Sequence, residues 1–191
     1  CTYTALSEVA STLEKEGVET EILHVGQKDI RGCIGCRKCK QTGKCVFDDI
    51  VNETARKFEA ADGIVIGSPV YFASANSTVI SFITRLFYST QFDKSMKVGA
   101  AVVSCRRGGG SATFVEINKL FTISGMPVAS SQYWNSVHGN TAEEVRQDLE
   151  GMQVMRTLGR NMAFLVKSIA LGRAQYGLPE KEPRVSTNFI R

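Results

Sequence analysis

Residues 63–72 read GIVIGSPVYF, an uncharged stretch in which β-branched residues lead into a proline and two aromatic residues. Apolar residues in a continuous run, rather than in alternation, are typical of a strand buried on both faces of a parallel sheet. A second run of this kind, VGAAVV, occupies residues 98–103. We therefore predict two central strands, followed by the loops SPVYF and SCRRGGGSAT respectively.

Helical patterns lie on both sides of these two strands. The chain opens with apolar residues at positions 6, 9, 10 and 13, which share one helical face, and Gly17 suits the end of that helix. Two further strand patterns occupy residues 18–25 and MPVASS at residues 126–131. The remaining helices are expected after Asp48 and Asp49, through Val79 and Leu86, through Ile117 and Phe121, and from Thr141 to about Leu171 with Gly151 and Gly159 as break points.

Helices that alternate with short buried strands predict an α/β fold, namely a doubly wound parallel sheet with helices on both faces. Such a sheet normally begins with a strand, whereas this chain begins with a helix, so we expect the first strand and its loop to lie upstream of residue 1. We predict one domain over residues 1–172, which includes a cysteine-rich loop at residues 33–45, and a C-terminal tail over residues 173–191.

The composition is that of an ordinary globular protein, and the sequence argues against a secreted, membrane-bound or nucleic-acid-binding protein. The chain has 191 residues, of which 43% are hydrophobic, and a net charge of +4. It opens without the charged and then apolar pattern of a secretory signal, so we expect a cytoplasmic location. The uncharged run at residues 63–84 contains Pro69 and Asn76 and divides into strand, loop and helix, so we expect no membrane partner. No RNA-binding motif is present, and we expect no nucleic-acid partner.

The sequence CIGCRKCKQTGKC at residues 33–45 contains four of the six cysteines, Cys33, Cys36, Cys39 and Cys45. In a cytoplasmic protein, cysteines grouped in this way more often bind metal or act in redox chemistry than form disulfides. Iron-sulfur clusters take four thiolates, often from three closely spaced cysteines and a fourth. Zinc also accepts four thiolates, although its sites usually pair two short hooks of cysteines. A cluster, a zinc ion and a loop of thiols without metal all remain open from the spacing alone.

Three loops are expected at one edge of the sheet, because the carboxyl ends of parallel strands meet there. Thr2 and Thr4 open the first helix, where free N–H groups favour a phosphate. Tyr71 and Phe72 follow the first strand and offer aromatic surface to a planar ring. The glycines at residues 108–110 follow the second strand and let backbone N–H groups approach a ligand. Each feature alone is common as a cap, a core pair or a flexible loop, but their combination predicts a nucleotide-like cofactor such as FMN.

The order of these motifs carries a resemblance to a known family. CTYTAL, CIGCRKCKQTGKCVFDD, GSPVYF and QYWNSVHG, followed by a long final helix, resemble the NADPH-dependent FMN reductase family and, within it, the iron-sulfur flavoproteins. The likeness extends from Cys1 to about Leu171. It implies a flavodoxin-like fold with a five-stranded parallel sheet in the order 2-1-3-4-5, and the family's phosphate loop would fall before residue 1.

The resemblance also implies roles for particular residues. Thr2 would bind the FMN phosphate, residues 68–72 would border the isoalloxazine ring, and residues 104–109 would reach the pyrimidine side of the flavin, while the four cysteines of the loop would ligate a [4Fe-4S] cluster. The residues expected at the flavin are Thr2, Thr4, Ser68, Pro69, Val70, Tyr71, Phe72, Ser104, Cys105, Arg106, Gly108 and Gly109, and those expected at the cluster are Cys33, Cys36, Cys39 and Cys45. Cys105 fits a small buried hydrophobe equally well. No catalytic residue is assigned, because hydride transfer to a flavin requires no side-chain acid or base.

The activity implied by the resemblance is that of an NAD(P)H-dependent FMN oxidoreductase. Electrons would pass between a nicotinamide or a reduced carrier, FMN and the [4Fe-4S] cluster, which converts between two-electron and one-electron chemistry. The alternatives are a cluster-free NAD(P)H:FMN or quinone reductase, a non-enzymatic flavodoxin-like electron carrier, and a zinc-stabilised binding domain.

Partners are suggested by one charged segment and by the final helix. Basic residues Arg37, Lys38, Lys40 and Lys44 suit either a solvated face or a docking patch for an acidic electron carrier such as a ferredoxin. The resemblance implies a homodimer or tetramer, with the helix from Thr141 to Leu171 as an interface element. The methionines of that helix, at positions 152, 155 and 162, fit an interface or a core equally well.

Overall fold

The sheet is built on two long parallel strands, in the positions that the apolar runs predict. In the computed structural model, which describes residues 1–183, 185–187 and 189, β1 (Gly63–Tyr71) pairs with β3 (Val98–Cys105) from Gly63↔Val98 to Pro69↔Ser104. The short β4 (Ser136–His138) adds in parallel to the end of β3, and β2 (Ser74–Ala75) pairs antiparallel with the end of β1. The sheet order in the described chain is therefore β2-β1-β3-β4.

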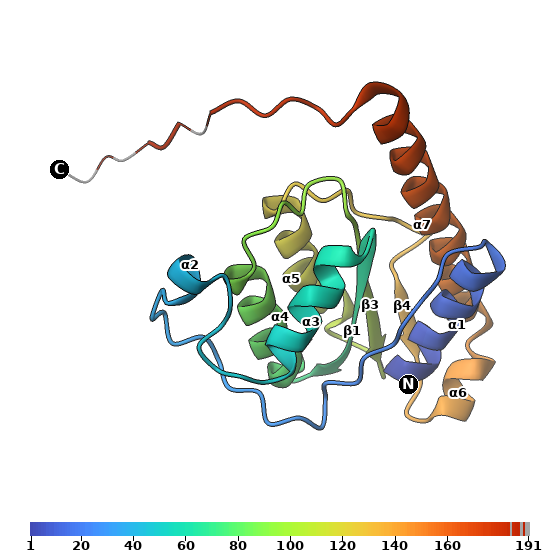
Figure 1. Cartoon of the computed structure of the whole chain (residues 1–191). Helices are drawn as coiled ribbons and strands as arrows, with labels where there is room; N and C mark the ends of the chain where they lie inside the picture. Colours follow the sequence, from blue (N-terminus) through green and yellow to red (C-terminus); the bar gives the residue numbers. More distant parts are fainter. Residues whose placement is uncertain (184, 188, 190–191) are drawn as a thin grey trace.

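Helices cover both faces of this sheet (Figure 1). One layer consists of α1 (Thr2–Lys15), α6 (Ala142–Gln147) and α7 (Leu149–Tyr176), and the other of α3 (Ile50–Ala60), α4 (Ser77–Ser89) and α5 (Gly110–Ile123). Val98, Ala100 and Val102 of β3 belong to the apolar core under the first layer, whereas Ala101 belongs to the core under the second. Every residue of β3 is buried, so the predicted doubly wound α/β fold is confirmed.

Local signals set several of the helix ends. Gly17, with a φ of +76°, follows α1, and the N–H of Val18 donates to the Leu13 carbonyl, which completes a Schellman motif. Asp49 accepts from the Val51 N–H at the start of α3. Asn76 accepts from two N–H groups in the first turn of α4, and Thr141 accepts from the Glu144 N–H in α6. The helices expected after Asp48 and Asp49, at residues 79–86 and at residues 117–121 are confirmed.

Four details differ from the sequence-based expectations. Residues 18–25 form no strand, because no described strand lies beside them to share a hydrogen-bond ladder, and the sheet does not show the expected 2-1-3-4-5 order. The MPVASS segment contributes only an isolated bridge between Val128 and Gly99, and the last strand is β4 instead. Residues 68–71 continue β1 rather than starting a loop, since they pair with both β3 and β2.

The long terminal helix α7 is continuous where breaks were expected. The chain breaks instead at Asp148, which separates α6 from α7 and whose side chain accepts from the Gly151 N–H. Gly159 lies where α7 crosses α1, and a Cβ there would come within 2.7 Å of the Thr12 Cβ. This glycine therefore permits close helix packing rather than a kink, and α7 continues past Leu171 to Tyr176. Of the helices in the described residues, none combines the length and apolar character that crossing a bilayer requires.

The cysteine loop projects from the end of the molecule opposite α1 and α7 (Figure 1). It contains one short helix, α2 (Cys39–Thr42), which ends at Gly43 with a φ of +71°. Gly35 and Arg37 also adopt positive φ angles, of 65° and 56° respectively. These left-handed residues fold the loop tightly back on itself.

Candidate functional site

The structure brings the four cysteines of the loop to one pocket. The pocket is lined by Cys33, Ile34, Cys36, Arg37, Cys39, Cys45, Val46, Phe47, Arg85, Tyr88 and Ser89. All four cysteines are free thiols, with Cys33 and Cys36 exposed, Cys45 half-buried and Cys39 buried. The Gly35 N–H donates to the Cys33 sulfur at 3.5 Å, which is the kind of backbone contact that supports a ligating thiolate.

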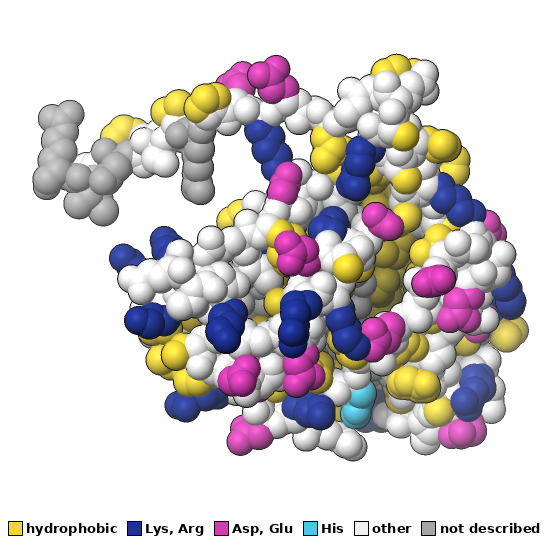
Figure 2. Space-filling view, viewed as in Figure 1, with side chains coloured by type: hydrophobic (Ala, Val, Ile, Leu, Met, Phe, Trp, Pro, Cys, Tyr) yellow, Lys and Arg dark blue, Asp and Glu magenta, His cyan; other side chains and the backbone are white. Residues whose placement is uncertain are grey.

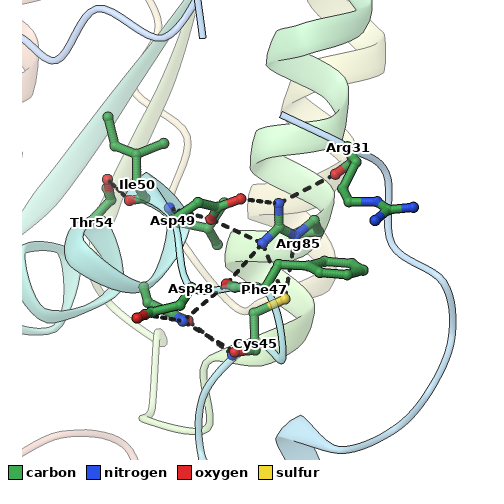
Figure 3. Close-up of polar contacts among 10 residues, drawn as sticks. Arg31, Cys45, Phe47, Asp48, Asp49, Ile50, Thr54 and Arg85 are labelled. Atoms are coloured by element: carbon green, nitrogen blue, oxygen red, sulfur yellow. Dashed lines mark hydrogen bonds and ion pairs between the residues drawn. The ribbon is translucent and has the colours of Figure 1, made fainter. Parts of the chain in front are cut away.

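Arg85 of α4 forms the base of this pocket. Its side chain is fully buried and pairs with Asp49 through two hydrogen bonds, from Nη1 at 2.7 Å and from Nη2 at 2.9 Å (Figure 3). Nε and Nη2 also donate to the Cys45 sulfur, at 3.3 Å and 3.2 Å. Burial lowers the pKa of Arg85, but hydrogen bonds and charge from Asp49 and Cys45 outweigh it and raise the pKa above its ordinary value. Arg85 therefore places a permanent positive charge against the Cys45 sulfur.

Other side chains fix the backbone of the cysteines. Asn52 of α3 accepts from the Cys45 N–H at 2.9 Å and donates to the Cys45 carbonyl at 3.1 Å. Gln91 donates to the Cys39 carbonyl. The ring of Phe47 lies near two guanidinium groups, 4.6 Å from that of Arg31 and 5.0 Å from that of Arg85. Cys45 is thus held by α3 and α4, and Cys39 by the segment that follows α4, rather than by the loop alone.

The outer face of the cysteine loop is basic. Arg37, Lys38, Lys40 and Lys44 are all exposed, and within the described residues none of them forms a salt bridge. Figure 2 shows Lys and Arg side chains gathered at the end of the molecule that carries this loop. The positive charge of the loop is therefore available to a partner.

A second site is expected at the carboxyl edge of the sheet, where three segments meet. The hydroxyls of Thr2 and Ser104 lie 2.7 Å apart and share a hydrogen bond between α1 and β3. A Cβ on Gly67 would come within 2.9 Å of Thr2 Cγ2, so α1 packs closely on β1 at this edge. A Cβ on Gly109, which has a φ of +85°, would come within 2.8 Å of Val70 Cγ1. The glycine loop, the end of β1 and the start of α1 are therefore in contact.

The aromatic pair Tyr71 and Phe72 lies on a tight hairpin between β1 and β2. Phe72 and Ala73 are the two central residues of the turn and have positive φ angles of 52° and 64°, which is the type I′ geometry normally taken by glycine or asparagine. Both aromatic side chains are exposed, Phe72 completely so. The strained turn therefore presents aromatic surface to solvent beside the glycine loop.

Glu116 of α5 holds this hairpin in place. One carboxylate oxygen accepts from Ser74 Oγ at 2.7 Å and from the Ala75 N–H at 3.0 Å. The pKa of Glu116 is lowered, chiefly by the hydrogen bond from the Ala75 backbone and also by that from Ser74, against an opposing effect of burial. Glu116 is thus an ionised clamp between α5 and β2.

Not every residue expected at the flavin faces this surface. Ser68 is fully buried, and its hydroxyl accepts from the Asn76 N–H and donates to the Pro69 carbonyl, so it braces the hairpin from inside. Thr4 is buried within α1. Cys105 is also buried, and burial first, then the charge of Asp148, raises the pKa of its thiol. Arg106 and Gly108 are exposed.

Comparison with known proteins assigns the chain to a family. A sequence profile of the NADPH-dependent FMN reductases matches residues 1–141, which is more than half of the chain. The chain belongs to the NADPH-dependent FMN reductase family. The resemblance inferred from the sequence motifs is therefore confirmed.

Within this family, the chain groups with the iron-sulfur flavoproteins. It is 34% identical over 170 residues to an iron-sulfur flavoprotein of Methanocaldococcus jannaschii, an alignment that covers 85% of this chain and 88% of the relative. An iron-sulfur flavoprotein of Methanosarcina thermophila is 29% identical over 165 residues, which cover 84% of this chain and 85% of the relative.

Solved structures of low sequence identity share the flavodoxin-like fold. RosB, solved with bound 8-demethyl-8-formylriboflavin-5'-phosphate, has a TM-score of 0.70 at 14% identity, with 100% of this chain and 85% of RosB covered. An archaeal flavodoxin has a TM-score of 0.57 at 16% identity, with 87% of this chain and 90% of the flavodoxin covered. The fold of this chain is therefore flavodoxin-like.

The donor set of the pocket is four cysteine side chains. In the described part of the chain, no group of three or more His, Cys, Asp or Glu side chains is arranged to hold one metal ion. Four thiolates are the ligand set that a [4Fe-4S] cluster takes, and zinc accepts the same set. Ser89 Oγ, which lines the same pocket, is buried and has no hydrogen-bond partner among the described residues. An orphaned donor beside four thiols is what a site built for further sulfur acceptors would contain.

Sequence reasoning missed the supporting residues of the two candidate sites, namely Asn52, Arg85, Ser89, Gln91 and Glu116. One signal pointed to Arg85: it is the first charged residue after the uncharged run at residues 63–84, on a helix rich in apolar residues. A lone charge on a buried helix flank requires a partner. Asn52 and Glu116 carried no such signal, because polar residues at these helical positions are common on exposed faces.

Proposed function

We propose that the protein is an iron-sulfur flavoprotein, an NAD(P)H-dependent oxidoreductase that passes electrons between a nicotinamide or a reduced carrier, FMN and a [4Fe-4S] cluster. The observation that supports this most strongly is the pocket of four free cysteines with Arg85 against the Cys45 sulfur, in a chain of the FMN reductase family. Two cofactor sites in one chain would couple two-electron donation to one-electron transfer.

The carboxyl edge of the sheet would hold the flavin. When bound, FMN accepts a hydride and exchanges single electrons, and the protein binds and orients it. Tyr71 and Phe72 would supply the aromatic surface, while backbone N–H groups of residues 104–109 would donate to the oxygen-rich edge of the ring. Thr2 would contribute its hydroxyl to the phosphate, and Arg106 lies exposed where it could meet a nicotinamide phosphate.

The cysteine pocket would hold the cluster. Cys33, Cys36, Cys39 and Cys45 would be its four ligands, and the cluster would supply one-electron transfer. Cys39 and Cys45 would form the inner side, close to α4, while Cys33 and Cys36 would form the exposed side of the loop. This arrangement leaves one side of the cluster open to a partner.

The test is an anaerobic purification of the protein followed by a visible spectrum and assays of flavin, iron and sulfide on one sample. Flavin with about four iron and four sulfide atoms per chain, together with bleaching of the flavin by NADPH or NADH, would support the proposal. Flavin without iron would favour the alternative of a cluster-free reductase over the proposal. Flavin that neither nucleotide bleaches would leave an electron carrier, and zinc without flavin would contradict the proposal outright.

The basic face of the cysteine loop favours an acidic electron carrier, such as a ferredoxin, as partner. Four exposed positive charges surround the proposed cluster, and complementary charge accelerates encounter between redox partners. We expect the rate of electron exchange with reduced ferredoxin to fall steeply with ionic strength, and to fall further in K40E. A rate that is insensitive to salt and to K40E would leave the loop as a solvated face.

Helix α7 favours a homodimer or tetramer. Phe164 and Leu171 are seven residues apart on one side of α7 and are 70% and 72% exposed. Met155 and Met162 are buried and Met152 packs against them, so the methionines of this helix belong to the core. Sedimentation of wild type against L171E tests the proposal: we expect dissociation of the oligomer in L171E, whereas a wild-type monomer would contradict it.

A further inference from the structure

Two polar side chains of α4 face the cysteine pocket from the same side. Arg85 and Ser89 are four residues apart and so lie one above the other on the helix. Arg85 is 1% exposed and Ser89 is 3% exposed. Neither residue is a proposed ligand of the cluster or of the flavin, so their place in a redox protein needs its own account.

The ion pair with Asp49, which does not line the pocket, orients the guanidinium of Arg85. Asp49, itself the N-cap of α3, holds Nη1 and Nη2 in a two-point pair, and the Phe47 carbonyl accepts from Nη2 at 3.3 Å. The fork is rigid and planar, so the pair with Asp49 fixes the direction of its remaining N–H groups. Nη1 also donates to the Arg31 carbonyl at 3.3 Å, while Nε and Nη2 reach the Cys45 sulfur. The result is a charged donor aimed at one cysteine sulfur.

Ser89 continues the same surface one turn later. Its hydroxyl is buried and has no acceptor among the described residues, although buried hydroxyls are nearly always paired. The pocket around it is formed largely by cysteine, apolar and aromatic side chains, in which sulfur is an acceptor for a hydroxyl. The Ser89 hydroxyl is therefore available to a sulfur atom within the pocket.

We propose that α4 is the hydrogen-bond donor wall of the cluster site, where Arg85 and Ser89 are positioning residues that orient Cys45 and donate to cluster sulfur atoms, and thereby raise the cluster's reduction potential. This inference rests on the proposed cluster. Reduction adds one electron and one negative charge to the cluster without breaking a bond. A positive charge and a hydroxyl directed at its sulfurs stabilise the more negative state, so their removal lowers the potential.

A purely structural role for Arg85 is the competing explanation. The pair with Asp49 joins α3 to α4, and that alone would account for the burial of the guanidinium. The two explanations differ in what they require of Ser89, which joins no elements, and in what they predict for the potential of a cluster that remains bound. The test therefore measures potential as well as cluster content.

The experiment is a dithionite titration of the anaerobically purified holoprotein, with the reduced cluster followed by EPR and iron and sulfide assayed on each sample. R85K keeps the charge but loses the planar fork, and S89A removes only the hydroxyl. Matched controls are R156K, where Arg156 pairs with Glu8 between α7 and α1, and S124A at the end of α5. In R85K we expect the equilibrium constant for reduction of the cluster to fall at least tenfold, so its reduction potential should be lower by about 59 mV for one electron. S89A should shift in the same direction by less, and both controls should match wild type.

The outcomes separate the inference from the function on which it rests. Wild type without iron and sulfide would refute the proposed cluster itself. Wild type with a cluster, but with R85K and S89A both at the wild-type potential, would overturn the donor wall. Where R85K does not accumulate as folded protein, S89A decides: a lowered potential with full cluster content supports the inference, and an unchanged potential overturns it.

Discussion

The hairpin that carries Tyr71 and Phe72 depends on Glu116, and this dependence gives a quantitative prediction. The carboxylate accepts two hydrogen bonds, from Ser74 Oγ at 2.7 Å and from the Ala75 N–H at 3.0 Å. Hydrogen bonds to charged groups contribute about 1.5–3 kcal/mol each, and neutral ones about 1 kcal/mol. E116A removes the acceptor for both donors and leaves the buried Ala75 N–H unpaired.

Because Glu116 is only half-buried, its two hydrogen bonds lie at the low end of this range and total about 3 kcal/mol. We expect E116A to lower the free energy of unfolding by about 2–3 kcal/mol, since the helix propensity of alanine offsets a few tenths of a kcal/mol. E116Q retains an oxygen acceptor but not the charge, so its loss should be about 1 kcal/mol. The control is E59A, which truncates an exposed glutamate on α3 and should change stability by less than about 0.5 kcal/mol. Urea unfolding followed by far-UV circular dichroism measures all three.

The strained turn provides a second, opposite perturbation. Ala73 has a φ of 64°, which costs a non-glycine residue about 1–2 kcal/mol, whereas glycine adopts it freely but loses about 0.5–1 kcal/mol of chain entropy. A73G should therefore stabilise the protein by about 0.5–1 kcal/mol. The argument for the Glu116 clamp is refuted if E116A unfolds at the same urea concentration as E59A. The argument for strain in the turn is refuted if A73G is destabilising.

The remaining predictions concern pH, the buried ion pair and one helix crossing. Because the pKa of Glu116 is lowered in the folded state, its stabilising contribution is complete above the ordinary glutamate pKa and is lost as pH falls through the lowered folded-state value. The difference in urea stability between wild type and E116Q should therefore shrink as the solution is made acidic. D49N keeps a helix cap but leaves Arg85 without its carboxylate, and it should cost about 3 kcal/mol in the same assay; a loss below about 1 kcal/mol would show that the charge is compensated elsewhere. G159A should lower the thermal midpoint, since its Cβ would press on α1. G172A lies in open space on the same helix and should raise the thermal midpoint, because alanine gains about 1 kcal/mol of helix propensity over glycine. Equal effects of the two variants would contradict the packing argument.

Periodicity and local chemistry predicted most of the helices and the two central strands. Both runs form the predicted strands, and the run at residues 98–103 is buried on both faces, as a continuous apolar run indicates. In the run at residues 63–67 only Ile66 is buried, and the other residues are half-buried. Asp49 and Thr141 cap helices where their side chains suit that role. These features are local, because each depends on residues within one or two turns.

The expectations that were wrong concern pairing and packing between distant segments. Residues 18–25 have a strand-like pattern, but a strand forms only where another strand supplies its hydrogen bonds. Gly151 and Gly159 were expected to break the final helix, yet Gly159 is accommodated because α1 approaches so closely that a side chain would clash. Both outcomes depend on residues that are distant in the sequence, so neither could be predicted from the local sequence.

For the candidate sites, too, the sequence indicated the local features and the tertiary structure showed which distant residues support them. The spacing of the four cysteines by itself indicated a thiolate site, and the order of the motifs indicated the family. Only the tertiary structure selected Arg85 and Ser89 from α4 and Asn52 from α3 as neighbours of those cysteines, and Glu116 as the clamp of the aromatic hairpin. The physical reason is that ligand spacing and helix capping are short-range properties of the chain, whereas a hydrogen bond between Arg85 and Cys45 joins residues 40 positions apart and exists only when α4 has docked beside the loop.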